Sequence, residues 1–154
     1  MRIETTRFGT IDVNDQSILQ MPDGMLGFEY CTRFVLIEDI PESAFKWLQA
    51  VDDAAVAFIV INPADFFPEY EVELTDGQAE SLDLKDPGES VMFTTVTVAR
   101  DEGKVTTNLV APIVINSRTL QARQVVLQDE RYCTKHVIGY SASGSSRPEA
   151  AKAA

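Results

Sequence analysis

The chain has 154 residues and a mass of 17.0 kDa, enough for one domain with a hydrophobic core of its own. Hydrophobic residues make up 45% of it and charged residues 24%, a balance that excludes disorder over most of its length. The 13 basic residues are outnumbered by 24 acidic ones, so the net charge is -11 and direct binding to nucleic acid or to an anionic membrane is disfavoured. We expect basic partners instead.

The sequence also bears on the compartment. No apolar run approaches the roughly 20 residues that cross a bilayer. Residues 1–6 lack the apolar core of a secretory signal, so we expect a cytoplasmic location and no membrane partner. Cys31 and Cys133 are the only cysteines, and in a reducing cytoplasm we expect two free thiols.

The N-terminal third predicts a hairpin, a loop and a strand. Polar and apolar side chains alternate through residues 2–8 and 10–13 on either side of Gly9, which predicts a small hairpin. Residues 21–29 contain two glycines and a proline and predict an irregular loop. The continuous apolar run at 34–37 predicts a strand that is buried on both faces.

The centre of the chain predicts a second hairpin followed by an aromatic corner. Residues 47–51 and 56–61 are rich in β-branched and aromatic side chains, and the turn sequence Asp-Asp-Ala-Ala separates them. Phe66 and Phe67 follow between two prolines, where neither a long helix nor a central strand can continue. If the corner is extended, its two rings point in opposite directions, so we expect one ring in the core and the other at least partly exposed.

An alternating segment and a short helix come next. In residues 69–74 the acids Glu69, Glu71 and Glu73 fall on one face of an extended chain and apolar side chains fall on the other. Thr75 and Gln78 have the spacing of a capping box, which predicts a helix from residue 76 to about residue 84.

The C-terminal half predicts three more strands and a tail. The strands are expected at 91–99, 109–116 and 123–127, and Pro112 requires the second to lie at a sheet edge or to carry a bulge. From residue 141 the composition changes to Ser, Ala and Gly. We therefore expect an all-β fold, a small barrel-like domain of short antiparallel strands with one or two short helices over residues 1–140, and a flexible tail over residues 141–154.

Residues able to carry out catalysis are few. His136 is the only histidine, so a histidine-rich metal site is excluded and a nucleophile-base pair has no evident partner. Asp52 and Asp53 are adjacent acids at a turn, where a solvated loop is the more common role. No phosphate-binding glycine pattern occurs. We expect no enzyme, no cofactor and no metal; the alternative, a small β-barrel enzyme, requires these three side chains to converge in one pocket.

The acidic residues cluster in the middle of the chain. Between residues 65 and 89 a single base, Lys85, accompanies the acids Asp65, Glu69, Glu71, Glu73, Asp76, Glu80, Asp83, Asp86 and Glu89. Two interpretations remain open: a solvated face that maintains solubility, or a docking surface for a basic protein. The aromatic corner favours docking, because apolar rings beside charges are typical of an interface. The predicted partner-binding residues are Asp65, Phe66, Phe67, Glu69, Glu71 and Glu73.

Several segments together resemble one known family. They are MRIETTRFGTIDV, PDGMLGFE, FVLIED, WLQAVDDAAVAFIVINPADFFPEYEVEL, VTTNLVAPIVIN and RQVVL, in this order from residue 1 to about residue 137. This constellation resembles the flagellar assembly factor FliW. The chain departs from that pattern at Met25-Leu26, where Leu-Pro is expected, and from residue 141 onward.

The resemblance implies a function in partner exchange. A member of this family is expected to be a non-enzymatic β-barrel-like protein that binds flagellin and also the translational repressor CsrA, an RNA-binding dimer. It would antagonise CsrA allosterically, so that flagellin level controls flagellin translation. The alternative within the same resemblance is a secretion chaperone that binds flagellin only.

Overall fold

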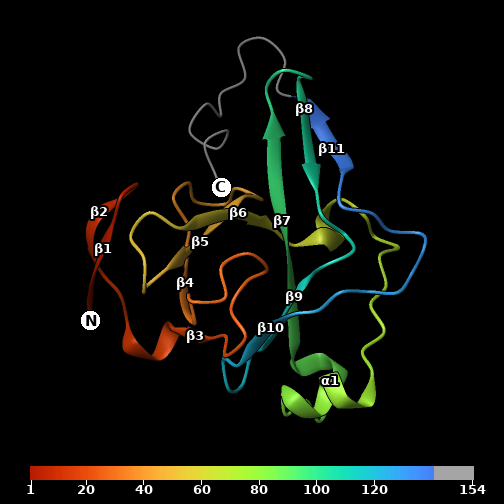
Figure 1. The fold of residues 1–154 in the computed structure, drawn as a ribbon, viewed down its shortest axis with the longest axis horizontal. Helices are drawn as coiled ribbons and strands as arrows, with labels where there is room; N and C mark the ends of the chain where they lie inside the picture. The colour runs from red at the N-terminus through yellow and green to blue at the C-terminus, as the bar shows by residue number, and fades with distance from the viewer. Residues whose placement is uncertain (141–154) are drawn as a thin grey trace.

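A computed structural model describes residues 1–140 as a curled antiparallel sheet with very little helix (Figure 1). Nine strands form the main sheet, and β1 and β2 form a separate hairpin. The strands are β1 (Arg2–Thr5), β2 (Gly9–Asp12), β3 (Leu19–Gln20), β4 (Arg33–Ile37), β5 (Lys46–Ala50), β6 (Ala57–Ile61), β7 (Ser90–Ala99), β8 (Lys104–Thr107), β9 (Ile113–Asn116), β10 (Ala122–Gln124) and β11 (His136–Tyr140). Every strand pair in these sheets is antiparallel, and the expected all-β class is confirmed.

The long strand β7 organises the main sheet. One of its edges pairs with β6, and the other pairs first with β9 and then with β8. The strand order is therefore β10-β9-β7-β6-β5-β4-β3, with β8 and β11 continuing from the far half of β7. In Figure 1 these last two strands rise at the upper right, and β9 and β10 lie at the lower end of β7.

The two ends of this strand order meet. Gln20 in β3 forms a parallel bridge to Gln121, and its N–H donates to the carbonyl of Leu120 at 2.9 Å. Because Gln121 directly precedes β10, this contact joins the first and last strands of the order. The sheet is thus barrel-like, and a single β-bridge connects its first and last strands.

The helical elements are short. The α-helix α1 (Asp76–Ser81) begins at Thr75, whose side chain accepts from the Gln78 N–H at 3.1 Å. The Gln78 side chain accepts in return from the Thr75 N–H at 2.9 Å, so the predicted capping box is confirmed. The helix ends at Ser81, earlier than expected. The 3-10 turns are η1 (Asp15–Ser17), η2 (Pro63–Asp65) and η3 (Pro87–Glu89).

Three apolar clusters hold the domain together. The largest packs side chains from β3–β7, β9 and β10 with Met21, Met25 and Cys31 of the 21–31 loop, and Phe34 and Leu48 are fully buried in it. A second cluster is built around Trp47, Ile59 and Val96. The third is centred on Leu82, Val114 and Val125, with partly buried side chains from residues 74–92 packed against it.

Most predicted strands are confirmed, with three corrections. Pro112 does not interrupt a strand, because β9 begins after it and its carbonyl instead accepts from the Val125 N–H at 2.9 Å. In β4 only Phe34 and Val35 are buried, and Leu36 and Ile37 are half-buried. Strands β3, β8 and β11 were not expected.

Two further expectations concern the chain as a whole. The predicted tail, residues 141–154, lies outside the described residues. Across residues 1–140, no helix is long and apolar enough to cross a membrane.

Candidate functional site

The aromatic corner is a helical turn, which differs from the extended chain assumed above. Asn62 caps η2 by accepting from the Ala64 N–H at 3.0 Å. The N–H groups of Phe66 and Phe67 both donate to the Pro63 carbonyl, at 3.1 and 2.8 Å. Pro63 favours this geometry because its ring fixes φ at the start of a helical turn.

The two rings of the corner still have different surroundings. Phe66 packs against the cluster of Trp47, and its ring centroid is 6.0 Å from that of Phe45. Phe67 contacts the His136 ring edge-on at 5.7 Å. Both side chains are half-buried and Asp65 is exposed. Neither ring is fully buried, so the expectation of one ring in the core is wrong, and the two rings differ only in their contacts.

A group of aromatic residues continues from the corner. The Tyr70 hydroxyl donates to the Leu109 carbonyl at 2.6 Å, and its ring meets that of Tyr132 at 4.8 Å. Burial raises the pKa of Tyr70 above its usual range. His136 Nε2 accepts from the Cys133 N–H at 2.9 Å, so this histidine holds a turn together. We assign it a structural role.

The acidic segment belongs to no sheet, and its first residue, Glu69, lies in a turn in which the Tyr70 N–H donates to the Phe67 carbonyl at 2.9 Å. Within residues 69–74 every second side chain is exposed, namely Glu69, Glu71 and Glu73, and the side chains between them are half-buried. The predicted alternation is therefore present, although the segment has no ladder partner within residues 1–140. Its only described backbone contact to a distant residue is the Glu71 N–H, which donates to the Tyr132 hydroxyl at 3.1 Å.

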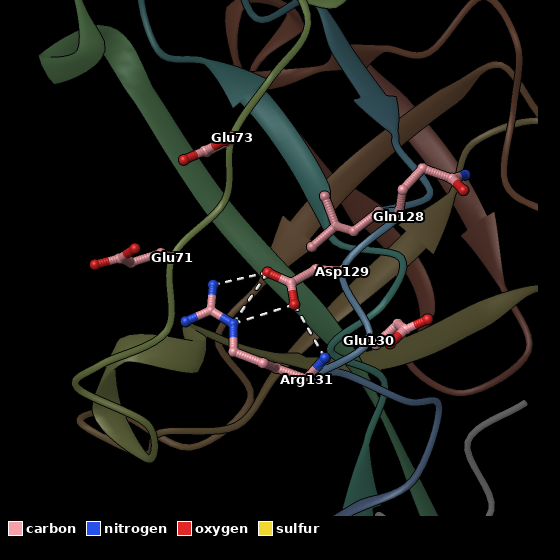
Figure 2. Close-up of a pocket in the computed structure, with 7 residues that line it drawn as sticks. Glu71, Glu73, Gln128, Asp129, Glu130 and Arg131 are labelled. Atoms are coloured by element: carbon pink, nitrogen blue, oxygen red, sulfur yellow. Dashed lines mark hydrogen bonds and ion pairs between the residues drawn. The ribbon is translucent and has the colours of Figure 1, made fainter.

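Alternate residues of this segment line two different grooves. The first, which we call the acidic groove, has a volume of about 480 Å³ and is lined by Glu71, Glu73, Leu127, Gln128, Asp129, Glu130 and Arg131 (Figure 2). The second, the apolar groove, has a volume of about 290 Å³ and is lined by Val72, Leu74, Ala79, Leu84, Lys85, Asp86, Ser90 and Met92. The segment separates a charged hollow from an apolar one.

The acidic groove carries excess negative charge. Arg131 makes a bidentate pair with Asp129, with Nη2 at 2.7 Å and Nε at 3.1 Å from the carboxylate oxygens. These hydrogen bonds lower the pKa of Asp129 and raise that of Arg131. Glu71, Glu73 and Glu130 form no salt bridge with any described residue. Four carboxylates and one guanidinium therefore line the groove.

Other acids of the cluster have structural roles. Arg118 forms salt bridges to Glu89 at 2.7 Å and to Asp83 at 3.2 Å. Nearby, the buried Asn116 side chain donates to the Leu82 and Asp83 carbonyls, which fixes the end of α1 against β9. Asp83 and Glu89 are therefore already paired with Arg118 and are less available for docking than the unpaired acids of the cluster.

The three side chains of the enzyme hypothesis do not converge. Asp52 accepts from the Thr32 and Arg33 N–H groups and from the Arg33 guanidinium, all within 3.2 Å. Burial alone would raise the pKa of Asp52, but these hydrogen bonds outweigh it and lower the pKa. Asp53 accepts from the Tyr30 hydroxyl at 2.8 Å. Strands β6, β7 and β8 separate β5, which ends beside these acids, from β11, which begins at His136.

The sequence analysis named two of the seven residues that line the acidic groove. Glu71 and Glu73 were predicted as partner-binding residues, but Asp129, Glu130 and Arg131 were not. The two segments are about 60 residues apart in sequence and each looks like an ordinary polar loop, so only the fold brings them together. Across residues 1–140, no group of three or more His, Cys, Asp or Glu side chains is arranged to hold a metal ion.

Known proteins resemble this chain over almost all of its described length. The family model "FliW protein" matches residues 2–138. A flagellar assembly factor FliW from Alkaliphilus metalliredigens is 39% identical over 139 residues, covering 90% of this chain and 86% of the relative. Its counterpart from Geobacter sulfurreducens is 40% identical over 148 residues, covering 96% and 92%.

A solved structure agrees in fold. A crystal structure of the flagellar assembly factor FliW superposes with a TM-score of 0.82 at 34% identity, covering 90% of this chain and 96% of that one. Sequence and fold thus agree over the same part of the chain, and the chain belongs to the FliW family of flagellar assembly factors.

Proposed function

We propose that this chain binds flagellin and a CsrA-type translational repressor in the cytoplasm and passes from one to the other as flagellin level changes. When flagellin is exported, the freed chain would bind the repressor and relieve repression of flagellin synthesis. When flagellin accumulates, the chain would be occupied and repression would return. The relatives' name, flagellar assembly factor, supports a role in making the flagellum.

The observation that carries this proposal is the exposed acidic face of residues 69–73. Glu69, Glu71 and Glu73 are all exposed, and the last two line a groove in which carboxylates outnumber guanidinium groups by four to one. A repressor that binds RNA must present a basic surface, because RNA is a polyanion. An acidic face of this kind is attracted toward such a surface, which speeds encounter with the repressor.

The net charge also supports antagonism without occupation of the RNA site. A protein of charge -11 that is docked beside an RNA-binding surface repels incoming phosphates. At physiological ionic strength this repulsion extends about 8 Å before screening removes most of it. Such repulsion would oppose RNA binding without occupation of the RNA site.

The experiment measures association of the purified chain with purified flagellin and, separately, with CsrA at several salt concentrations. We expect both to bind. The triple variant Glu69→Gln, Glu71→Gln, Glu73→Gln should bind CsrA more slowly at low salt and with a flatter salt dependence, because exposed charges act mainly on the association rate. Its thermal midpoint should not change, because all three side chains are exposed.

Two outcomes contradict parts of the proposal. An unchanged salt slope in the triple variant would exclude this face from recognition. Binding of flagellin without any binding of CsrA would leave the secretion chaperone as the function.

A further inference from the structure

Within the acidic segment, the backbone of residues 72–74 is free to pair with another chain. Among residues 1–140 no hydrogen bond involves the backbone N–H or carbonyl groups of residues 72–74, although this stretch is extended. An extended segment with unpaired backbone groups is a template for an added β-strand.

The two grooves provide places for the side chains of such a strand. In an added strand, side chains directly opposite each other lie on the same face of the sheet. Residues opposite Glu71 and Glu73 would therefore share the acidic groove, and residues opposite Val72 and Leu74 would share the apolar groove. Because the residues at 71–74 alternate between the two grooves, the side chains of the partner strand must alternate between the two grooves as well.

The charge of the acidic groove decides which side chains fit. Its lining carries four carboxylates, and its single base, Arg131, already pairs with Asp129. Figure 2 shows the Arg131 guanidinium on the side of Asp129 that faces the chain of Glu71, where attraction to Glu71 contributes to its raised pKa. A basic side chain from a partner would make a comparable contact with the remaining carboxylates.

We propose that residues 71–74 accept an extended partner segment as an added β-strand, with basic and apolar residues alternating along that segment. Basic side chains would face Glu71 and Glu73, and apolar side chains would enter the groove between Val72, Leu74 and Met92. This inference rests on the proposed function, because it describes how a protein partner is recognised. It adds the conformation and the sequence pattern of the segment that is bound.

The test uses the full chain and labelled ten-residue peptides, with binding followed by fluorescence anisotropy. The probe alternates lysine and valine, and its control has the same composition with five lysines followed by five valines. Strand addition predicts that the alternating peptide binds at least about fivefold more tightly. Equal affinity would overturn the proposal, because attraction between opposite charges alone does not depend on residue order.

Backbone methylation of the peptide distinguishes strand addition from side-chain recognition. In an added strand every second N–H points toward the edge that it joins. Methylating the amides of either the lysines or the valines should therefore reduce affinity at least about fivefold in one of the two peptides. If both methylated peptides bind as well as the parent, the proposal is wrong.

A charge variant of the chain tests the register. Glu71→Gln with Glu73→Gln should weaken binding of the alternating peptide by about two- to thirtyfold, the effect of losing two cross-strand ion pairs. The matched control, Glu42→Gln with Asp101→Asn, removes two exposed charges elsewhere and should change affinity by less than about twofold. Equal losses in the two variants would contradict the assigned register.

Failure of the inference and failure of the proposed function are separable. If intact flagellin and CsrA bind but the alternating peptide shows no preference over its control, strand addition is wrong and partner exchange stands. If neither intact protein binds, partner exchange is wrong whatever the peptides do.

Discussion

The two phenylalanines of the corner should differ in what they contribute. Truncating a buried phenylalanine to alanine costs about 3–5 kcal/mol, and Phe66 is half-buried against the Trp47 cluster, so we expect Phe66→Ala to cost about 1.5–2.5 kcal/mol of unfolding free energy. Phe67 is also half-buried, but it packs against none of the three apolar clusters, and its ring contact with His136 is worth about 0.5–1.5 kcal/mol. Phe67→Ala should therefore destabilise less and should lose at least about 2 kcal/mol of partner binding.

The assay combines urea unfolding with affinity measurements for flagellin and CsrA on each variant. Phe45→Ala is the matched control, because Phe45 packs on the same cluster as Phe66 but lies outside the corner. It should lower stability without a specific loss of affinity. If Phe66→Ala and Phe67→Ala both lose stability and neither loses affinity beyond the control, the corner is part of the core and its assignment as an interface is wrong.

Three further predictions concern the stability of the domain. The pKa of Asp52 is lowered by folding, so its contribution to stability is present above about pH 4 and is lost as the pH falls. Asp52→Asn should therefore cost about 1–2 kcal/mol of unfolding free energy at pH 7, and the fall of that free energy in acid, measured by urea unfolding, should become shallower. An unchanged fall in acid would refute this. Gly24 has φ +65°, and a Cβ there would lie 2.6 Å from the Glu29 Cα. Gly9 also has a positive φ, but a Cβ there meets nothing within 4 Å, so Gly24→Ala should lower the thermal midpoint well below that of Gly9→Ala. Equal midpoints in the two variants would contradict the clash. A chain truncated after Tyr140 should unfold sharply at the midpoint of the full chain, because all three clusters lie before that residue, and a large drop would show that the tail contributes to folding.

Locally encoded features could be predicted from the sequence. The hairpin of β5 and β6 follows from two short apolar runs and the turn between them, and the start of α1 follows from the capping box of Thr75 and Gln78. The alternating exposure of residues 69–74 also follows from a period of two. Each of these signals lies within about 15 residues of chain.

Features that depend on distant residues could not be predicted. Strands β3 and β8 are short and β11 contains a register shift, and each owes its place to a neighbouring strand more than to its own pattern. Arg118 lies about 30 residues from Asp83 and Glu89, so the salt bridges that make these acids structural are invisible in the sequence. The acidic groove likewise exists only because the fold places residues 127–131 beside the predicted acidic face.

The claim that one chain exchanges two partners is tested most directly by competition. A preformed complex of this chain with CsrA is titrated with purified flagellin, and the free CsrA is followed by its binding to a labelled flagellin messenger RNA leader. Partner exchange predicts that flagellin releases CsrA and restores RNA binding, with a midpoint set by the two affinities. Formation of a stable ternary complex, with CsrA still unable to bind RNA at saturating flagellin, would contradict it.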